Sequence, residues 1–172
     1  MNNRVLLILT AAAALAGCGG TSTALPPGGK PLGQAWVLST DEPGVRYQVA
    51  ALNVRDPARA APGVFGAVPT GPQERLIGVQ YRITAVAGSV NENANECAAV
   101  LGSNEQVYPA LSQQANTITA GTNFDKGKVT LGQGGSETGW VAFQVPGGVK
   151  VTSVMWTPND GSDGNQAPWS VP

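Results

Sequence analysis

The densest group of oxygen-bearing side chains is the segment Asn159–Asn165, with the sequence NDGSDGN. Asp160 and Asp163 could chelate calcium there, because calcium prefers carboxylate and carbonyl oxygens. The spacing does not match an EF-hand loop, which alternates acidic or amide residues and ends on a distal glutamate. Asp, Asn and Gly also favour turns, since they tolerate left-handed backbone conformations. The segment is therefore either a turn or a calcium site, and we expect a turn.

Other reactive side chains offer little for catalysis. The chain contains no histidine, which removes the usual general base near neutral pH and the imidazole ligands of zinc. Ser136 sits in a glycine-rich turn with no base to activate it. The segment Gly121–Val129 is not a phosphate-binding loop, because its first glycine lies too far from Gly127-Lys128. We predict a protein that is not an enzyme and holds no cofactor.

Two of the four tryptophans are candidates for a binding surface. Trp140 lies on the opposite face of its predicted strand from Phe143, and exposed aromatic side chains often mark binding surfaces. The candidate surface comprises Trp140, Trp156, Asp160 and Asp163. The alternative is that Trp140 packs beneath a loop or against a neighbouring edge strand.

The N-terminal residues predict export. Val5–Ala16 is an apolar run too short for the roughly 20 residues of a membrane-spanning helix, so we assign residues 1–17 to a signal peptide. The run ends on Leu15, Ala16, Gly17 and Cys18. These residues resemble the lipobox of bacterial lipoproteins. The resemblance implies that a diacylglyceryl group is joined to the Cys18 sulfur and that cleavage leaves Cys18 first. An ordinary cleaved signal with a coincidental cysteine is the alternative.

This anchor sets the expected location of the protein. Two acyl chains give stable attachment, so we expect a lipid-anchored protein on the extracytoplasmic side of the envelope, with the membrane as its partner through Cys18. Residues 18–33, rich in Gly, Pro and small side chains, predict a flexible tether, and residues 34–172 the folded domain. The net charge of −1 and the lack of a basic run argue against nucleic-acid binding.

Alternating apolar residues predict strands. Arg75–Val86 shows the cleanest alternation and indicates a half-buried antiparallel strand. Thr130–Pro146 predicts a core hairpin whose second strand buries Val141, Phe143 and Val145. Val45–Val54 should carry a bulge or break near Ala50, where the apolar phase slips by one residue, and Asp56-Pro57 should close it. Further strands are expected at Gln34–Ser39, Cys97–Leu101, Gln106–Tyr108, Val149–Trp156 and Trp169–Val171. Val90–Glu96, which holds Glu92 and Glu96, is expected to be a polar loop.

About seven or eight short strands without a helical period predict an all-β protein, an antiparallel β-sandwich. Five features of the sequence carry a resemblance to a known family. They are the segments Arg55-Asp56-Pro57, RLIGVQYRIT, GSNEQVY and GxxETGWVAFQVP, and a tryptophan near the C-terminus. They resemble the immunoglobulin-like domain of unknown function in secreted and lipid-anchored bacterial proteins, related to immunoprotective extracellular antigens. The likeness covers Ala35–Val171, implies an immunoglobulin-like sandwich and transfers no catalytic residue.

Two functions remain open. The first is a non-enzymatic, lipid-anchored binding or accessory module of the cell envelope. The alternative is a carrier of a small apolar ligand or a calcium ion, with a pocket lined by Trp140 or Trp156 or an ion at Asp160. Cys97 has no partner once Cys18 carries lipid, and its apolar neighbours predict a buried structural thiol with a raised pKa.

Overall fold

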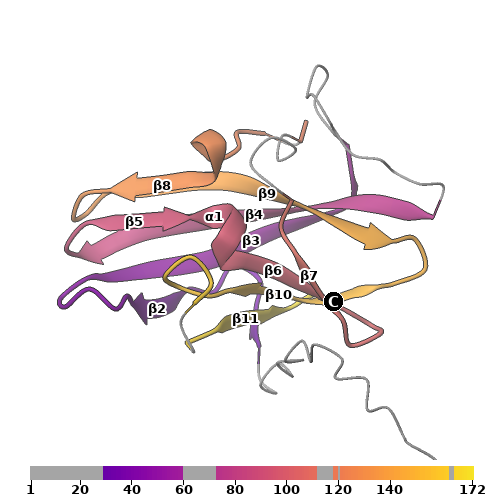
Figure 1. Cartoon of the computed structure of the whole chain (residues 1–172), viewed down its shortest axis with the longest axis horizontal. Coiled ribbons are helices and arrows are strands. Elements are labelled where there is room, and N and C mark those ends of the chain that lie inside the picture. Colours follow the sequence, from indigo (N-terminus) through magenta and orange to yellow (C-terminus); the bar gives the residue numbers. More distant parts are fainter. Residues whose placement is uncertain (1–28, 60–72, 112–117, 120, 163–164) are drawn as a thin grey trace, which may run out of the picture.

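Strands account for most of the domain. A computed structural model describes residues 29–59, 73–111, 118–119, 121–162 and 165–172. Two sheets pack face to face as a β-sandwich, and a third, two-stranded sheet extends one end (Figure 1). The predicted all-β sandwich is confirmed.

The first sheet has the order β1-β11-β10-β6-β7. Its strands are β1 (Lys30–Pro31), β6 (Ala98–Gly102), β7 (Val107–Pro109), β10 (Val151–Trp156) and β11 (Ala167–Ser170). The second sheet has the order β2-β3-β4-β9. Its strands are β2 (Trp36–Ser39), β3 (Arg46–Ala58), β4 (Glu74–Ala87) and β9 (Ser136–Pro146). All neighbours are antiparallel except β1 and β11, which are parallel.

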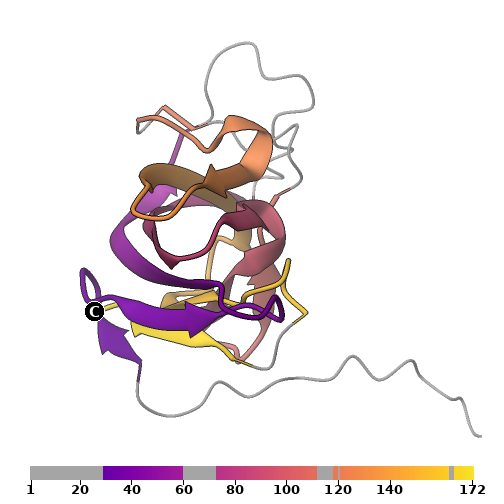
Figure 2. The ribbon, with the colours of Figure 1, turned by 90° about the vertical axis from the view of Figure 1, so that its left-hand side faces the viewer.

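The third sheet pairs β5 (Val90–Asn93) with β8 (Lys128–Leu131). Two single turns of helix complete the fold, α1 (Ala94–Cys97) and the 3-10 turn η1 (Asp125–Gly127). Neither turn, in the part of the chain that the structure describes, has the length and hydropathy to span a bilayer. The strands β1 and β2 lie on one side of the domain and η1 on the other (Figure 2).

The main core lies between the two large sheets. The inner face of β4 carries Ile77, Val79, Tyr81, Ile83 and Ala85, all buried as the alternation predicted. Val141, Phe143 and Val145 of β9 are fully buried beside them. The register of β3 against β4 shifts between Ala51 and Asn53, so the predicted bulge is confirmed. It keeps apolar side chains of β3 facing the core on both sides of the slip.

The outer face of the second sheet carries a smaller apolar cluster, which we call the outer cluster. Ile118, Trp140 and Ala142 form it, with Ala58 and Leu111 at its margin. The backbone N–H of Leu111 donates to Ala142 O at 2.9 Å, and that of Trp140 donates to Thr122 O at 3.1 Å. The edge of β9 is therefore covered by neighbouring chain, which protects it from pairing with another molecule.

Several expectations about element boundaries were wrong. Val90–Asn93 forms a strand and not a loop, because Val90 and Glu92 alternate as inward-facing residues. The predicted hairpin of Thr130–Pro146 does not pair with itself, since β8 pairs with β5 and β9 pairs with β4. β3 continues through Asp56-Pro57 to Ala58.

The tether and strand count also differ from expectation. Lys30 and Pro31 pair with Trp169 and Ser170 of β11, so the folded domain starts before Gln34. The described residues contain eleven strands where seven or eight were expected. The extra strands are two to four residues long, and so short a segment has too few residues to show a period of two.

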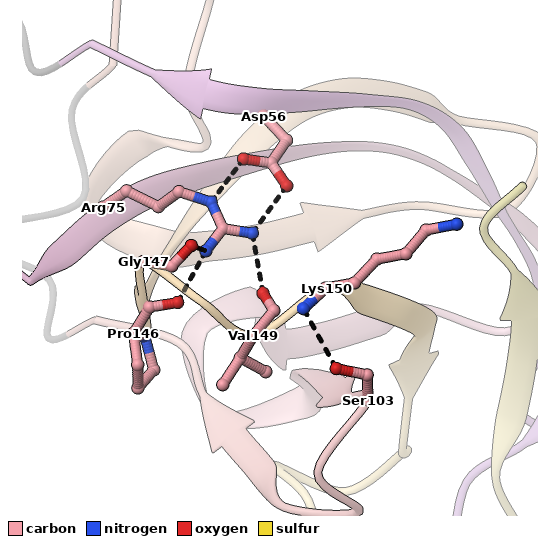
Figure 3. Close-up of polar contacts among 7 residues, drawn as sticks. All are labelled: Asp56, Arg75, Ser103, Pro146, Gly147, Val149 and Lys150. Carbon is pink, nitrogen blue, oxygen red and sulfur yellow. Dashed lines mark hydrogen bonds and ion pairs between the residues drawn. The ribbon is translucent and has the colours of Figure 1, made fainter.

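A saturated arginine closes one end of the sandwich (Figure 3). The guanidinium of Arg75, at the start of β4, donates to both carboxylate oxygens of Asp56, at 2.6 and 2.9 Å. It also donates to three carbonyl oxygens of the β9–β10 turn, those of Pro146 (2.6 Å), Gly147 (3.2 Å) and Val149 (2.8 Å). Asp56 raises the pKa of Arg75 through these bonds, so the group stays charged. One side chain thus joins β3, β4 and the β9–β10 turn.

Next to these hydrogen bonds of Arg75, which we call the Arg75 clamp, two further hydrogen bonds join the β9–β10 turn to the turn between β6 and β7 (Figure 3). The Lys150 N–H donates to the Ser103 hydroxyl at 3.1 Å, and the Ser103 N–H donates to Lys150 O at 2.7 Å. The turns at this end of the two sheets are therefore held to each other by one backbone hydrogen bond and one to the Ser103 side chain.

We predict that Arg75→Lys lowers the free energy of unfolding by about 1–3 kcal/mol, because an ammonium has three donors where the guanidinium serves five acceptors. Chemical denaturation measures the change. Arg82→Lys is the matched control, since Arg82 is an exposed arginine on the same strand. It should shift stability by no more than about 0.5 kcal/mol. Equal effects would show that the clamp contributes nothing specific.

Candidate functional site

The candidate site is an acidic cavity formed by three loops at the opposite end of β4 from Arg75. The β2–β3 turn, the β4–β5 turn and the β10–β11 loop surround a volume of about 250 Å³. Four acidic residues line it: Asp41, Glu42, Glu92 and Asp160. None of its lining residues, all within the described part of the chain, is basic. The Asp41 N–H donates to the Asn159 side-chain oxygen at 3.2 Å and ties two of the loops together.

Glu92 forms the floor of this cavity and is only 4% exposed. Its Oε1 accepts from the Tyr47 hydroxyl and the Asn159 N–H, both at 3.2 Å. Its Oε2 accepts from the Cys97 thiol at 3.2 Å and the Asp160 N–H at 3.1 Å. Both carboxylate oxygens are therefore satisfied by donors, as a buried carboxylate requires.

Local sequence explains why these donors converge. Asn93 ends β5 and caps α1, with its Oδ1 accepting the Asn95 N–H at 3.1 Å. The single turn of α1 then returns the chain so that Cys97 reaches Glu92, five residues before it. The Asn93 N–H donates to Asp160 Oδ1 at 2.7 Å, which joins the β10–β11 loop to the same turn.

The β10–β11 loop adopts left-handed backbone conformations, with φ of 55° at Asn159, 51° at Asp160 and 83° at Gly161. Asn, Asp and Gly are the residues that accept this region most readily. A Cβ on Gly161 would also lie 2.6 Å from the Glu96 carbonyl oxygen, so glycine is required there. These conformations support the turn interpretation of the segment. Asp163 lies outside the described residues.

A hydrogen-bond relay connects the cavity to the main core. The Trp156 indole N–H donates to the Tyr47 oxygen at 2.9 Å, and the Tyr47 hydroxyl in turn donates to Glu92. Burial and then the Glu92 charge raise the pKa of Tyr47, so the phenol keeps its proton. Trp156 is 0% exposed and its ring packs against Tyr81 at 5.2 Å between centroids.

The tryptophans therefore do not form the binding surface that the sequence suggested. Trp156 is inside the main core, and Trp140 is 4% exposed within the outer cluster. Trp140 packs with Ile118, which comes from outside the strands, and this is the alternative that the sequence left open. Of the four candidate surface residues, Asp160 lines the acidic cavity.

Cys97 is the buried structural thiol that its neighbours predicted. It is 2% exposed, and burial followed by the Glu92 charge raises its pKa. The sulfur therefore stays protonated and acts as a hydrogen-bond donor. A thiol held in this state is a poor nucleophile, because the thiolate is the reactive form.

Glu92, Cys97 and Asp160 place one ligand atom each within 4.8 Å of one another, close enough for a metal ion. The chemistry of the set argues against a preformed site. A metal would have to displace the thiol proton of Cys97 and compete with the N–H groups that donate to both carboxylates. Calcium, which prefers oxygen ligands, would instead meet Asp41, Glu42 and the outer oxygen of Asp160.

Ser136 has a structural position. Its hydroxyl donates to Ile83 O at 3.0 Å and shares a 2.9 Å hydrogen bond with the Thr84 hydroxyl, inside the β4–β9 ladder. The segment that superficially resembled a phosphate loop contains η1 and continues into β8. Neither feature contributes a reactive group to the cavity.

No family model matches the chain, and no curated protein matches its sequence. Solved structures share its fold. The secreted protein MPT63 of Mycobacterium tuberculosis is 18% identical with a TM-score of 0.57, over 85% of this chain and 98% of that one. The yjhA protein of Bacillus subtilis is 9% identical with a TM-score of 0.52, over 83% and 99%. The candidate lipoprotein ycdA of Bacillus subtilis is 12% identical with a TM-score of 0.50, over 78% and 38%.

At these identities the likeness establishes the β-sandwich alone. It agrees with the fold that the sequence resemblance implied, while membership of that particular domain family stays a prediction. The chain spans 38% of the ycdA chain and nearly the whole of the other two.

Sequence reasoning missed the centre of the site. Tyr47, Glu92 and Cys97 lie 45 and 5 residues apart along the chain, and only the fold brings them together. One signal was present, because Val90 and Glu92 alternate with Asn91 and Asn93 as in a strand. A glutamate on the inward face of a strand indicates a buried carboxylate that needs donors.

We predict that Glu92→Gln lowers the free energy of unfolding by about 1–3 kcal/mol, because the amide NH₂ would face two donors in place of one carboxylate oxygen. Denaturant unfolding measures this loss. Labelling of Cys97 by a thiol reagent should be slow in the folded wild type and faster in the variant. Glu96→Gln is the control, since Glu96 is exposed and keeps an acceptor for its 2.7 Å bond from Asn93. Equal unfolding and labelling of the two variants would contradict the role of Glu92.

Proposed function

We propose that the protein is a lipid-anchored lipoprotein of the cell envelope whose β-sandwich acts as a non-enzymatic binding or accessory module. The sequence Leu15-Ala16-Gly17-Cys18 carries the proposal of anchoring. Cys18 and its motif lie outside the residues that the structure describes. The proposal is supported by the position of β1, the first described strand, which starts at Lys30, twelve residues after Cys18.

The distance from the anchor to the domain follows from the sequence. The ten residues 19–28 lie between Cys18 and Gly29. Fully extended, they reach at most about 36 Å. The domain would therefore stay close to the membrane on its extracytoplasmic side. The similarity of fold to a secreted protein and a candidate lipoprotein supports this location.

Binding is favoured over catalysis by the state of the groups in the acidic cavity. The Glu92 carboxylate is fully occupied by donors, and the Cys97 thiol keeps its proton. Among the described lining residues, no nucleophile is paired with a free base, as covalent catalysis requires. The rim residues Asp41, Glu42 and Asp160 instead offer exposed carboxylates to a partner.

We predict that Cys18→Ala releases the protein from membranes or blocks its processing. Fractionation and mass spectrometry of the mature N-terminus measure both outcomes. Cys97→Ala is the matched control, because it removes the other cysteine and should leave the protein in the membrane fraction. An unmodified cysteine at the mature N-terminus, or cleavage at another residue, would contradict the anchor.

The alternative function is a carrier, and one observation favours its calcium form. Three exposed carboxylates, those of Asp41, Glu42 and Asp160, surround one cavity without a basic residue among its lining. The form with a small apolar ligand loses its support, because Trp140 and Trp156 are buried by the protein itself.

If calcium binds, it should stabilise the folded state by about 2.7 kcal/mol at a free concentration one hundred times its Kd. Thermal unfolding with calcium and with a chelator measures the effect. Asp41→Asn together with Asp160→Asn should remove it, whereas Asp125→Asn in η1, which does not line the cavity, should not. If the melting temperature of the wild type is the same with calcium and with a chelator, calcium carriage is excluded. The proposal of an anchored binding module does not depend on this result.

A further inference from the structure

A second cavity lies at the far end of β3, on the same sheet as the outer cluster. It has a volume of about 280 Å³ and is lined by Arg55, Pro57, Ala58, Arg59 and Thr119. This space is several times that of one water molecule in the liquid, about 30 Å³, so it can hold a small polyatomic ion. The acidic cavity and the buried Glu92 network share no residue with it.

The first arginine is fixed by the sheet. Arg55 pairs with Gly78 of β4, and directly opposed residues of two strands point to the same face. Gly78 faces the outer cluster, because a Cβ there would lie 2.4 Å from Ile118 and 3.3 Å from Trp140. The Arg55 side chain therefore leaves the sheet on the side of the outer cluster.

The second arginine is fixed through its backbone. The Arg59 carbonyl oxygen accepts from the Thr119 N–H at 2.9 Å and from the Thr119 hydroxyl at 3.3 Å. Thr119 follows Ile118, which is 2% exposed and anchors this segment to the outer cluster. The positions of both arginine backbones are thus set by packed elements.

The charge of this cavity is positive and uncompensated. Arg55 and Arg59 are its charged lining residues, and none of the described residues that line it carries a carboxylate. Asp56, their neighbour in sequence, is held by both of its oxygens on Arg75. Neither the Arg55 nor the Arg59 guanidinium makes a hydrogen bond or ion pair with any residue that the structure describes. The protein as a whole has a formal charge of −1, so the local charge at this cavity is opposite in sign to the net charge.

We propose that this cavity binds a phosphate group, held between the Arg55 and Arg59 guanidinium groups. A guanidinium presents a planar set of donors that matches phosphate and carboxylate oxygens in pairs. One guanidinium is enough for the two oxygens of a carboxylate. Two arginines lining one cavity supply donors for an ion with more oxygens and a charge near −2, which is the chemistry of phosphate.

The position of the cavity indicates the source of the phosphate. The end of β3 and the strand β1 lie on opposite sides of the domain in both ribbon views (Figures 1 and 2). The chain continues from β1 toward Cys18, so the cavity lies on the side of the domain opposite the attachment of the tether. The phosphate would therefore belong to a molecule outside the anchoring membrane and not to its lipid headgroups. This orientation rests on the proposed anchoring at Cys18, whereas phosphate binding itself does not.

The test is a calorimetric titration of the full-length processed protein, in detergent micelles, with inorganic phosphate at a constant ionic strength of about 0.15 M, where the Debye length is about 8 Å. The wild type should bind one phosphate per chain in a saturable manner. Arg55→Ala and Arg59→Ala should each weaken binding by about tenfold or more, because each removes a charge-assisted pair of hydrogen bonds. Both side chains are exposed, so the variants should unfold at the wild-type temperature.

Arg82→Ala is the matched control. Arg82 is exposed on β4, two strand positions beyond Gln80 on the outer face of the same sheet, and outside the cavity. It removes the same charge and should change phosphate affinity by less than twofold. No saturable binding by the wild type would overturn the proposal, and so would an equal loss in Arg82→Ala, which would indicate a general charge effect.

Vesicles of phosphatidylglycerol distinguish the source. The chain with Cys18→Ala, which lacks the lipid, should bind these vesicles as strongly as the same chain that also carries Arg55→Ala, and its phosphate titration should match that of the wild type. Vesicle binding that is lost in Arg55→Ala would overturn the assignment to a molecule outside the membrane. Failure of the anchor at Cys18 would leave the phosphate titration unaffected, so the two proposals fail separately.

Discussion

The burial of one carboxylate organises the loop end of this domain. Glu92 points inward from a four-residue strand, and a carboxylate in that position is costly unless donors surround it. The donors come from β3, α1 and the β10–β11 loop, through Tyr47, Cys97 and the backbone of Asn159 and Asp160. Glu92 therefore holds together three segments that are distant from one another in the sequence. Their convergence on this carboxylate forms the acidic cavity.

Arg75 has the corresponding role at the opposite end of β4. Its guanidinium serves five acceptors from β3 and from the β9–β10 turn. One end of the sandwich is thus closed on a buried anion and the other on a partly buried cation, and in both cases the hydrogen-bonding groups are saturated. Both side chains have their hydrogen-bonding groups occupied within the protein, whereas the cavities beside them are lined by exposed charged side chains.

The two cavities have opposite charge and different supports. The acidic cavity is made by loops over the Glu92 network, whereas the cavity of Arg55 and Arg59 is supported by the outer cluster. Trp140, which the sequence suggested as a ligand contact, instead contributes to that support by packing against Ile118. An aromatic side chain on the outer face of a sheet thus packs against Ile118 here, while exposed charged side chains line both cavities.

Local sequence determined the parts of this protein that depend on near neighbours. The period of two located β4 and β9 and their inward faces, the slip near Ala50 located the bulge, and apolar neighbours predicted a buried Cys97. These features follow from side-chain alternation, which each strand carries by itself.

Only the tertiary structure decided which strands pair and which polar groups meet. β8 pairs with β5 and not with β9, although a glycine-rich turn joins β8 to β9. β5 was missed because its inward residues are a valine and a glutamate, and the glutamate becomes acceptable inside only when Tyr47 and Cys97 donate to it. Such contacts depend on the closure of long loops, whose outcome is set by the packing of the whole sandwich and leaves no local trace in the sequence.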